Sequence, residues 1–417
     1  KPEDENGVSS FQALMVSTAS RVGTGNIIGV SSAICIGGFG SVFWMWIIAI
    51  IGSASALIES TLAQIYKRKG KDGECYGGPA YYIEAALHCR PLAIIFCISM
   101  IATYAFGFNM LASYNLQSTF SGFSFYDVKW TPWIIGGILA LITGWCLLGG
   151  GSRIVKVTST LVPAMGVAYI LISVIVMIIN RAYLPVVFSK IISEAFDFKA
   201  IFGAFAGSAM MQGIRRGLYS NEAGIGSAPN ASASAQVSHP IKQGLVQMLS
   251  VFIDTLLLCT ATAMMCLSSG IAPAQELQGA PWVQAALHES LGNFGPLFIT
   301  VAMVLFAFTT LLGNCFYCDN LLNYIHKGQP SKTFMKGFRI VSALVVFIGA
   351  GMEVSMLWNI SDVLMGVMAL INIPVILILS NTALKALADY EKQKKNGENP
   401  VFKTRNIGLE YETDYWS

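Results

Sequence analysis

The chain consists of long apolar runs separated by short polar segments, a pattern typical of a protein that crosses a membrane many times. An α-helix needs about 20 predominantly apolar residues to span the hydrocarbon core of a bilayer. The runs that can be assigned as spans are residues 11–37, 41–66, 92–122, 131–150, 157–179, 200–219, 244–268, 294–323, 338–352 and 357–380. The pattern therefore predicts an all-α polytopic membrane protein with ten transmembrane helices. Three shorter segments, 79–87, 186–198 and 280–291, are predicted to form helices at the membrane surface.

The first apolar run is interrupted near its middle by Gly23, Thr24, Gly25 and Asn26, beside the charged Arg21. Non-helical backbone at membrane depth persists only where protein buries it or where it lines a cavity. A single glycine in a membrane helix more often marks close packing against a neighbouring helix. Two glycines, a hydroxyl and an amide in four residues instead favour a mid-membrane break, a typical place for a solute or ion site.

The sixth run, AIFGAFAGSAMMQGIRRGLYSNEAG, is predicted to break at residues 207–213. Each half of the chain then has five spans, so the halves would lie in opposite orientations as a 5+5 inverted repeat with helices 1 and 6 broken. The predicted domains are a polar N-terminal segment (1–10), a first five-helix repeat (11–180), a second inverted repeat with re-entrant or surface helices (181–380) and a cytoplasmic tail (381–417).

Composition and charge support a membrane protein and set its orientation. The sequence is 54% hydrophobic and 12% charged, about half the charged fraction of a soluble domain. Its net charge of +3 gives no nucleic-acid signature. If the first span begins in the cytoplasm, 20 of the 26 basic residues lie in inner segments, Arg215 and Arg216 among them, and four lie outside. This excess predicts that orientation, with a cytoplasmic C-terminus.

Three stretches in this order resemble the alanine/glycine:cation symporter family. They are FQALMVSTASRVGTGNIIGVSSAI near the N-terminus, RRGLYSNEAGIGSAPNASASA after the sixth run, and VLFAFTTLLGNCFY in the eighth. The resemblance covers nearly the whole chain and implies a leucine-transporter-like fold and a sodium-coupled amino-acid carrier. Family members usually have one further helix before the FQAL segment, and its absence here is expected of a chain truncated at its N-terminus.

An amino-acid zwitterion requires an anion site and a cation site close together, and the two predicted breaks can supply both. Backbone N–H groups at a helix start favour a carboxylate, and released carbonyls can receive the ammonium group. The substrate-binding residues predicted in the two breaks and their apolar walls are Gly23, Thr24, Gly25, Asn26, Phe205, Ala209, Met210, Met211 and Gln212. By resemblance, Ala112 stands where the family usually places a substrate-contacting glutamine, and Gln212 is a possible replacement for that amide.

The resemblance also implies a sodium site between spans one and eight, since Thr309 and Thr310 match the paired hydroxyls of the family. Carbonyls near Ser20, Gly23 and Phe306 would complete the oxygen ligands that a hard cation prefers. The alternative is that both threonine hydroxyls bond only to preceding carbonyls of their own helix. No cofactor other than Na⁺ as the coupling ion is expected.

Three charged residues, Arg21, Glu59 and Asp254, are predicted to lie at membrane depth. An unpaired charge at the centre of a membrane helix costs about 2.5–3.5 kcal/mol on insertion scales. Either acid could therefore pair with Arg21 as a structural ion pair or inner gate. A proton-coupling role for one of the acids is the alternative.

These features predict a sodium-coupled secondary active symporter that imports a small neutral amino acid, alanine or glycine, by alternating access. The expected location is the plasma membrane of a bacterium or archaeon, and the expected partners are the amino acid, Na⁺ and the lipid bilayer, with the protein a monomer or weak oligomer. An enzyme is not expected, because no catalytic set or metal-ligand spacing occurs at a shared depth. The alternatives are the same fold carrying a larger neutral amino acid such as glutamine, or a channel or receptor on this scaffold.

Overall fold

The computed structural model describes residues 8–70, 75–197, 207–409 and 413–416 of the 417-residue chain. Within these residues, eight helical segments are long and apolar enough to cross a membrane. They are α3 (Gly40–Ile65), α5–η2–α6 (Arg90–Ile101, Ala102–Gly107, Phe108–Ser118), α7 (Thr131–Leu148), α8 (Gly151–Ile179), α13–η4–α14 (Pro240–Val251, Phe252–Cys259, Thr260–Leu267), α16 (Phe294–Ile325), α17 (Lys332–Ala350) and α18 (Val354–Lys395). Eight of the ten predicted spans are thus single long helices or helices with a π-helical turn.

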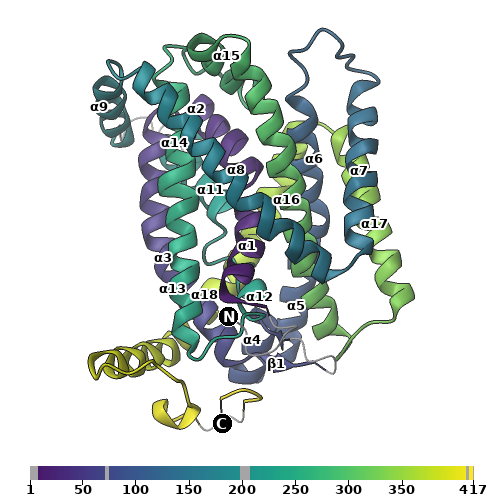
Figure 1. Cartoon of the computed structure of the whole chain (residues 1–417), viewed down its shortest axis with the longest axis vertical. Helices are drawn as coiled ribbons and strands as arrows, with labels where there is room; N and C mark the ends of the chain where they lie inside the picture. Colours follow the sequence, from purple (N-terminus) through teal and green to yellow (C-terminus); the bar gives the residue numbers. More distant parts are fainter. Residues whose placement is uncertain (1–7, 71–74, 198–206, 410–412, 417) are drawn as a thin grey trace.

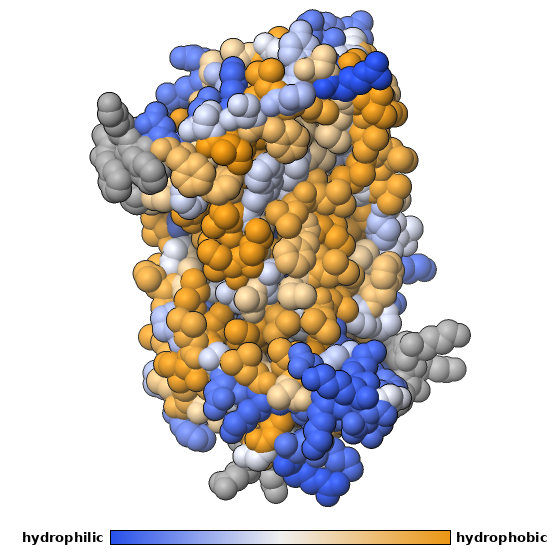
Figure 2. Space-filling model, turned by 90° about the vertical axis from the view of Figure 1, so that its left-hand side faces the viewer, coloured by the Kyte–Doolittle hydropathy of each residue, from blue (hydrophilic) through white to orange (hydrophobic). Residues whose placement is uncertain are grey.

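The helices form an upright bundle, with α9 and α15 at its upper end and both termini at its lower end (Figure 1). On the face shown in Figure 2, apolar residues cover the middle of the bundle and hydrophilic residues gather at both ends. Large apolar side chains point outward from this band; Leu141 of α7 and Leu370 of α18 are each 77% exposed. Such a broad exposed apolar surface is suited to lipid contact.

The three predicted surface helices are α4 (Pro79–Leu87), α9 (Leu184–Ala195) and α15 (Ala280–Leu291). Proline occupies the first helical turn of each, where no intrahelical N–H donor is required. A small antiparallel hairpin of β1 (Arg68–Lys69) and β2 (Cys75–Tyr76), which the sequence pattern did not predict, follows α3 at the lower end (Figure 1).

The first apolar run is a broken helix, as predicted. It consists of α1 (Ser10–Arg21), the π-helical turn η1 (Gly25–Gly29) and α2 (Val30–Gly37). The capping box of Ser9 and Gln12 fixes the start of α1, and the helix ends at Val22, whose backbone leaves the helical conformation. The chain therefore stops and restarts a helix between Arg21 and Gly25.

The break predicted at residues 207–213 is wrong. Helix α11 (Ala209–Asn221) continues through Gln212 and Gly213, and it ends at Glu222, which has a positive φ of 54°. The non-helical segment is 222–228, where Gly224 and Gly226 also have positive φ, and α12 (Pro229–Ser232) follows.

Gly213, which suggested a break at residues 207–213, instead allows α11 to pack closely against α3. A Cβ on Gly213 would lie 2.4 Å from the Ser41 carbonyl oxygen and 2.7 Å from the Cβ of Trp44, both close to the upper end of α3. Small residues in membrane helices allow this close approach. The sequence pattern alone therefore did not separate a packing glycine from a break.

The chain after α18 folds back under the lower end of the bundle. The Trp416 indole N–H donates to the Gln64 carbonyl at 2.8 Å, and the Phe402 N–H donates to the Ser238 carbonyl at 2.9 Å. The buried Lys67 ammonium lies 4.7 Å from the ring centroid of Tyr415 and 5.1 Å from that of Trp416. The tail thus connects the lower end of α3 with the loop before α13.

His239 links the lower part of α18 to the start of α13. Its Nδ1 accepts a hydrogen bond from the Ile241 N–H at 3.2 Å and its Nε2 lies 3.4 Å from Asp389 of α18, so the neutral ring with hydrogen on Nε2 satisfies both contacts. Burial lowers the pKa of His239 to about 4, although the hydrogen bond to Asp389 acts in the opposite direction. Protonation would remove the acceptor that caps α13.

We predict that the thermal stability of the protein falls as the pH is lowered from about 6.5 toward 4. The pKa of His239 is lower in the folded chain than its ordinary value near 6.5, so the unfolded chain binds the proton more readily in this window. In His239→Asn, asparagine can still cap the helix but cannot titrate. Melting temperatures at pH 7.5 and 5 should show a smaller loss in this variant than in the wild type. An equal loss in both would contradict the role given to His239.

Candidate functional site

The two broken segments meet at one level of the bundle. The Ser20 hydroxyl at the end of α1 donates to Oε1 of Glu222 at 2.6 Å. A Cβ on Gly25 would lie 3.1 Å from the Tyr219 ring and 3.2 Å from the Cα of Ser220. The start of η1 therefore lies against the last turn of α11, and both helix interruptions face the same interior region.

Asn26 holds the first break in shape. Its side-chain oxygen accepts from the Gly23 N–H at 2.8 Å, and its Nδ2 donates to Oδ1 of Asp254 in η4 at 2.7 Å. The other carboxylate oxygen of Asp254 accepts from the hydroxyls of Ser220 and Thr255, each at 2.9 Å. The Asn26 backbone N–H already bonds to the Gly23 carbonyl at 3.2 Å. The side chain of Asn26 thus ties the first break to α13–η4–α14.

Glu59 and Asn372 hold the second break. The Gly224 N–H donates to one carboxylate oxygen of Glu59 at 3.3 Å, and Asn372 of α18 donates to the other at 2.9 Å. Asn372 also donates to the Gly224 carbonyl at 2.9 Å and accepts from the Tyr82 hydroxyl at 2.5 Å. These contacts satisfy backbone groups that the non-helical segment releases inside the bundle.

Thr24 is surrounded by polar groups that the sequence analysis missed. Its hydroxyl lies 3.2 Å from the Tyr219 hydroxyl and accepts from Nδ2 of Asn115 at 3.3 Å. Asn115 lies one turn after Ala112 on α6. Ala112 itself is fully buried in an apolar cluster with Leu116, Leu139, Ala307, Leu311 and Val346. An amide from the same helix is therefore present near the first break, three residues beyond the position named from the resemblance.

The residues predicted to bind sodium are brought together between α1 and α16. A Cβ on Gly23 would lie 2.0 Å from Oγ1 of Thr310 and 3.5 Å from the Ser20 carbonyl oxygen. The Thr310 hydroxyl donates to the Phe306 carbonyl at 2.8 Å, and the Thr309 hydroxyl contacts the Leu305 carbonyl at 3.0 Å and the Phe306 carbonyl at 3.1 Å. These are the bonds to preceding carbonyls of the same helix that the alternative predicts. Each hydroxyl that donates in this way keeps lone pairs with which it can bind a cation.

The residues of α11 that were predicted to bind substrate do not lie beside the first break. A Cβ on Gly37, at the upper end of α2, would lie 3.0 Å from the Cβ of Gln212 and 3.1 Å from the Cα of Ala209. Gly37 is eleven residues beyond Asn26, so the turn of α11 that carries Ala209, Met210, Met211 and Gln212 is well above the first break. Phe205 lies outside the described residues.

The predicted ion pair between Arg21 and Glu59 or Asp254 does not form among the described residues. Nη1 of Arg21 donates to the Gln247 side-chain oxygen at 2.9 Å. Nε and Nη2 of this buried guanidinium have no hydrogen-bond partner in the described part of the chain. Arg21 nevertheless interacts electrostatically with Glu59, Glu222 and Asp254. It therefore balances several carboxylates from a distance instead of pairing with one.

Arg215 and Arg216 are not in a lower loop, where the orientation argument placed them. They lie on α11 beside the upper half of α3, since a Cβ on Gly217 would approach Ile48 to 2.6 Å. Arg216 forms a bidentate pair with Asp362 of α18 at 3.0 and 2.8 Å, and its guanidinium lies 3.9 Å from the Trp358 ring centroid. This buried pair lies above the level at which the two breaks meet.

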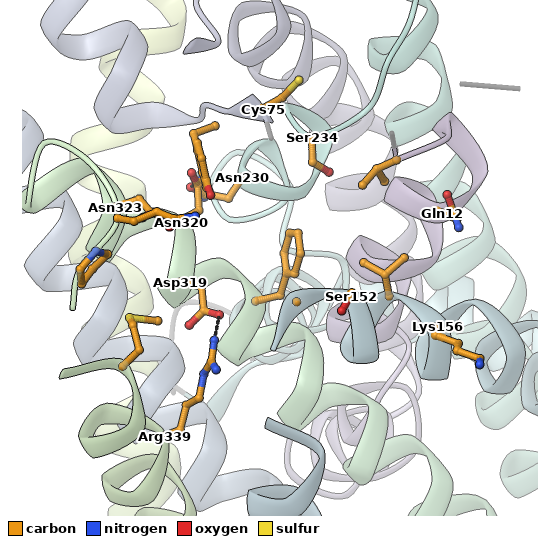
Figure 3. Close-up of a pocket in the computed structure, with 18 of the residues that line it drawn as sticks. Gln12, Cys75, Ser152, Lys156, Asn230, Ser234, Asp319, Asn320, Asn323 and Arg339 are labelled. Carbon is orange, nitrogen blue, oxygen red and sulfur yellow. Dashed lines mark hydrogen bonds and ion pairs between the residues drawn. The ribbon is translucent and has the colours of Figure 1, made fainter. Parts of the chain in front are cut away.

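A cavity of about 760 Å³ opens on the lower side. Its walls include Gln12 of α1, Ser152 and Lys156 of α8, and Asp319 and Asn320 of α16 (Figure 3). Asp319 pairs with Arg339 of α17 at 2.9 Å, which compensates the charge of this arginine. The cavity is lined by α1, α8, α16 and α17, and two of these helices, α1 and α16, also carry predicted sodium residues.

Comparison with solved structures identifies the fold. The chain resembles MhsT, crystallised with L-phenylalanine, with a TM-score of 0.57 and 14% identity over 88% of this chain and 89% of that one. It resembles a manganese transporter of Eremococcus coleocola with a TM-score of 0.59 and 12% identity over 100% of this chain and 84% of that one. Both are transporters of the leucine-transporter fold.

Sequence comparison gives the family. AlsT of Bacillus subtilis, an amino-acid carrier protein, is 44% identical over 408 residues, which are 98% of this chain and 85% of that protein. The sodium/alanine symporter AgcS of Methanococcus maripaludis is 37% identical over 94% of this chain and 86% of that protein. The probable sodium/glutamine symporter GlnT of B. subtilis is 42% identical over 95% of this chain and 82% of that protein. Residues 1–404 match the family profile, and the chain belongs to the sodium:alanine symporter family.

Proposed function

We propose that this protein is a sodium-coupled symporter that imports a small neutral amino acid by alternating access. The observation that carries this proposal is the meeting of two broken helices, with Gly25 of the first against Tyr219 and Ser220 of the second. Helix ends at this depth offer oriented N–H and C=O groups to a zwitterion. The sodium/alanine and sodium/glutamine relatives support the coupling ion and the substrate class.

The proposed architecture is a 5+5 inverted repeat of ten transmembrane helices. The eight long spans account for eight of them. The two broken helices are α1–η1–α2 and α11–α12, with the non-helical segment 222–228 between α11 and α12. The lower end with both termini faces the cytoplasm of a bacterium or archaeon. Even without Arg215 and Arg216, the basic residues remain concentrated in the lower loops and the tail, in keeping with the positive-inside pattern.

The proposed substrate site lies beside Thr24 and Gly25. The N–H groups at the start of η1 and the Thr24 hydroxyl receive the carboxylate. Carbonyls of the last turn of α11, which have no helical donors beyond Asn221, receive the ammonium group. The rings of Phe108 and Trp358 lie 4.9 and 5.0 Å from the Tyr219 ring and limit the size of the side chain. Gly23 and Asn26 are proposed to shape the break beside this site, whereas Ala209–Gln212 lie too high to contact it.

The proposed sodium site keeps the residues predicted from the resemblance: the carbonyls of Ser20, Gly23 and Phe306 and the hydroxyls of Thr309 and Thr310. The closeness of Gly23 to Thr310 supports it, because it brings an oxygen of α16 against the non-helical backbone after α1. Sodium bound between the two helices would hold α1 against α16.

Alternating access then needs a closure on each side of the site. Above it, the Arg216–Asp362 pair with Trp358 and Tyr219 forms the upper gate. Below it, the cavity between α1, α8 and α16 is the release path. Loss of sodium would free α1 to move away from α16 and widen this path.

Glutamine is the second candidate substrate. GlnT is about as similar to this chain as AlsT and AgcS are. Asn115 would then supply the amide that contacts the substrate.

We predict that the purified protein in liposomes takes up labelled alanine faster with an inward sodium gradient than with equal sodium on both sides. Counterflow competition with unlabelled alanine, glycine and glutamine would rank the substrates. We expect alanine and glycine to compete, and stronger competition by glutamine would select the second candidate. Absence of sodium-stimulated uptake of all three, with insertion verified, would contradict the proposed function.

We predict that Gly23→Ala lowers sodium-driven uptake about tenfold or more, because the added methyl group cannot fit beside Oγ1 of Thr310. Overpacking of this kind costs about 1–3 kcal/mol, and about 1.4 kcal/mol corresponds to a factor of ten. Gly166→Ala on α8 is the matched control, since no atom lies within 4 Å of its added Cβ. Equal uptake by the two variants would show that Gly23 does not lie in a tight ion site.

A further inference from the structure

Helices α7 and α17 pack side by side at one edge of the bundle (Figure 1) and enclose a groove of about 520 Å³ between them. A Cβ on Gly144 of α7 would lie 3.4 Å from the Cβ of Ala343 on α17, so small residues leave the space between the helices open. Leu141 and Leu344, which also line the groove, are 77% and 54% exposed. The groove therefore belongs to the outer apolar surface that is suited to lipid contact.

One face of α17 changes from basic to apolar along its length. Lys332, Lys336 and Arg339 follow one another at spacings of four and three residues, so they share a face at the lower end of the helix. The same face continues upward with the apolar residues of α17 that line the groove: Ile340, Ala343, Leu344 and Phe347. This pattern suits a molecule that joins an anionic group to a hydrocarbon chain.

Arg339 stands where the groove meets the lower cavity, since Arg339 and Leu148 line both. Nη2 of Arg339 donates to Asp319 at 2.9 Å (Figure 3), and a Cβ on Gly150 would lie 3.9 Å from its Nη1. The guanidinium is thus held at the turn between α7 and α8. Because it has five N–H donors, it can bind a phosphate oxygen and keep its bond to Asp319.

Trp145 marks the depth of this end of the groove. Its side chain lines the groove and is 66% exposed. The Arg153 guanidinium lies 4.7 Å from its ring centroid, and Nη1 of Arg153 donates to the Trp145 carbonyl at 2.9 Å. Tryptophan is enriched at the boundary between membrane and water. The basic end of the groove therefore lies at the level of lipid headgroups.

The transported species do not account for the charge at this end. Among the described residues, the cavity is lined by four basic side chains, Lys156, Lys332, Lys336 and Arg339, and by one acidic side chain, Asp319. A zwitterion carries no net charge, and a net positive wall repels Na⁺. Orientation in the membrane explains an excess of basic residues at the lower end. It does not explain why three of them lie in line with an apolar groove.

We propose that the groove between α7 and α17 binds an anionic phospholipid, with an acyl chain between the two helices and the phosphate at Lys332, Lys336 and Arg339. Basic pockets between membrane helices on the cytoplasmic side are typical sites for anionic headgroups. The headgroup would lie at the rim of the proposed release path, so uptake would depend on the composition of the inner leaflet. This effect on uptake rests on the proposed function, whereas the binding does not.

Native mass spectrometry of the purified, delipidated full chain measures the binding directly. Phosphatidylglycerol and phosphatidylethanolamine with the same acyl chains compare an anionic with a zwitterionic headgroup, and glycerol 3-phosphate is an anionic competitor without chains. We expect phosphatidylglycerol to bind about tenfold more tightly than phosphatidylethanolamine, and glycerol 3-phosphate not to displace it.

The double variant Lys332→Gln/Lys336→Gln should bind phosphatidylglycerol about tenfold or more weakly than the wild type, because two charges that attract the headgroup are lost. Lys392→Gln/Lys395→Gln is the matched control. It removes the same charge from exposed positions at the lower end of α18, away from the groove, and should bind the lipid as the wild type does.

Gly137→Leu tests the acyl-chain part of the site. Its Cβ would lie at an ordinary contact distance of 3.8 Å from the Phe347 ring, so the rest of the side chain would fill the groove. Gly166→Leu on α8, where no atom lies within 4 Å of the added Cβ, is the control. Binding of phosphatidylglycerol should fall in the first variant and not in the second.

Equal binding by the double lysine variant and its control would overturn the proposal. Displacement of the lipid by glycerol 3-phosphate would also overturn it, since the basic residues would then bind phosphate without the groove. A dimer of the wild type that Gly137→Leu dissociates would do the same, because a second copy would occupy the groove. Retained lipid binding without sodium-driven uptake would argue against the proposed function and leave the lipid site in place.

Discussion

The structure depends on one constraint: two helices are interrupted where lipid cannot supply hydrogen bonds, so the protein must satisfy every group that these interruptions release. The bond from Ser20 to Glu222 joins the two interruptions directly. Around it, side chains of other spans complete the backbone bonds, with Asp254 holding Asn26 and Glu59 with Asn372 holding Gly224. Asp254 and Glu59, two charged residues deep in the bundle, therefore stabilise the two interruptions, and this structural role is separate from any role in transport.

The same constraint explains which parts of the fold could be predicted from the sequence. Eight spans were visible because each is a continuous apolar run, and the break at Gly23–Asn26 was visible because its polar residues stand alone within such a run. The break at 222–228 was not visible, since Arg215, Arg216 and Glu222 make the surrounding sequence resemble a loop. Asp362 and Trp358 contact Arg216, and Ser20 hydrogen-bonds to Glu222, and these partners are distant in sequence. Pairing of this kind cannot be read from local hydropathy.

The candidate site was predictable to a similar extent. The closeness of Gly23 and Thr310 could be predicted because the resemblance implied a shared sodium site, whereas Asn115, Tyr219 and Asn314 had no local signal. Their positions follow from how α6, α11 and α16 pack around the first break. One local signal of the second break was available. Gly224 and Gly226 stand close together beside a glutamate, and the first break is likewise rich in glycine. Assigning residues 200–219 as the sixth span placed that signal outside the membrane.

The charge distribution links the fold to coupling. The Arg216–Asp362 pair is neutral as a unit, whereas the region where the breaks meet holds three carboxylates and one guanidinium. A zwitterionic amino acid adds no net charge, so it cannot balance this region. In the proposed function Na⁺ can, and a sodium ion bound between α1 and α16 would stabilise the arrangement in which these two helices lie together. A ligand shifts a conformational equilibrium only as far as its affinity differs between the two states. The proposed sodium site, which takes residues from both α1 and α16, would give Na⁺ that difference, and the amino acid would then bind to a site that Na⁺ has already assembled.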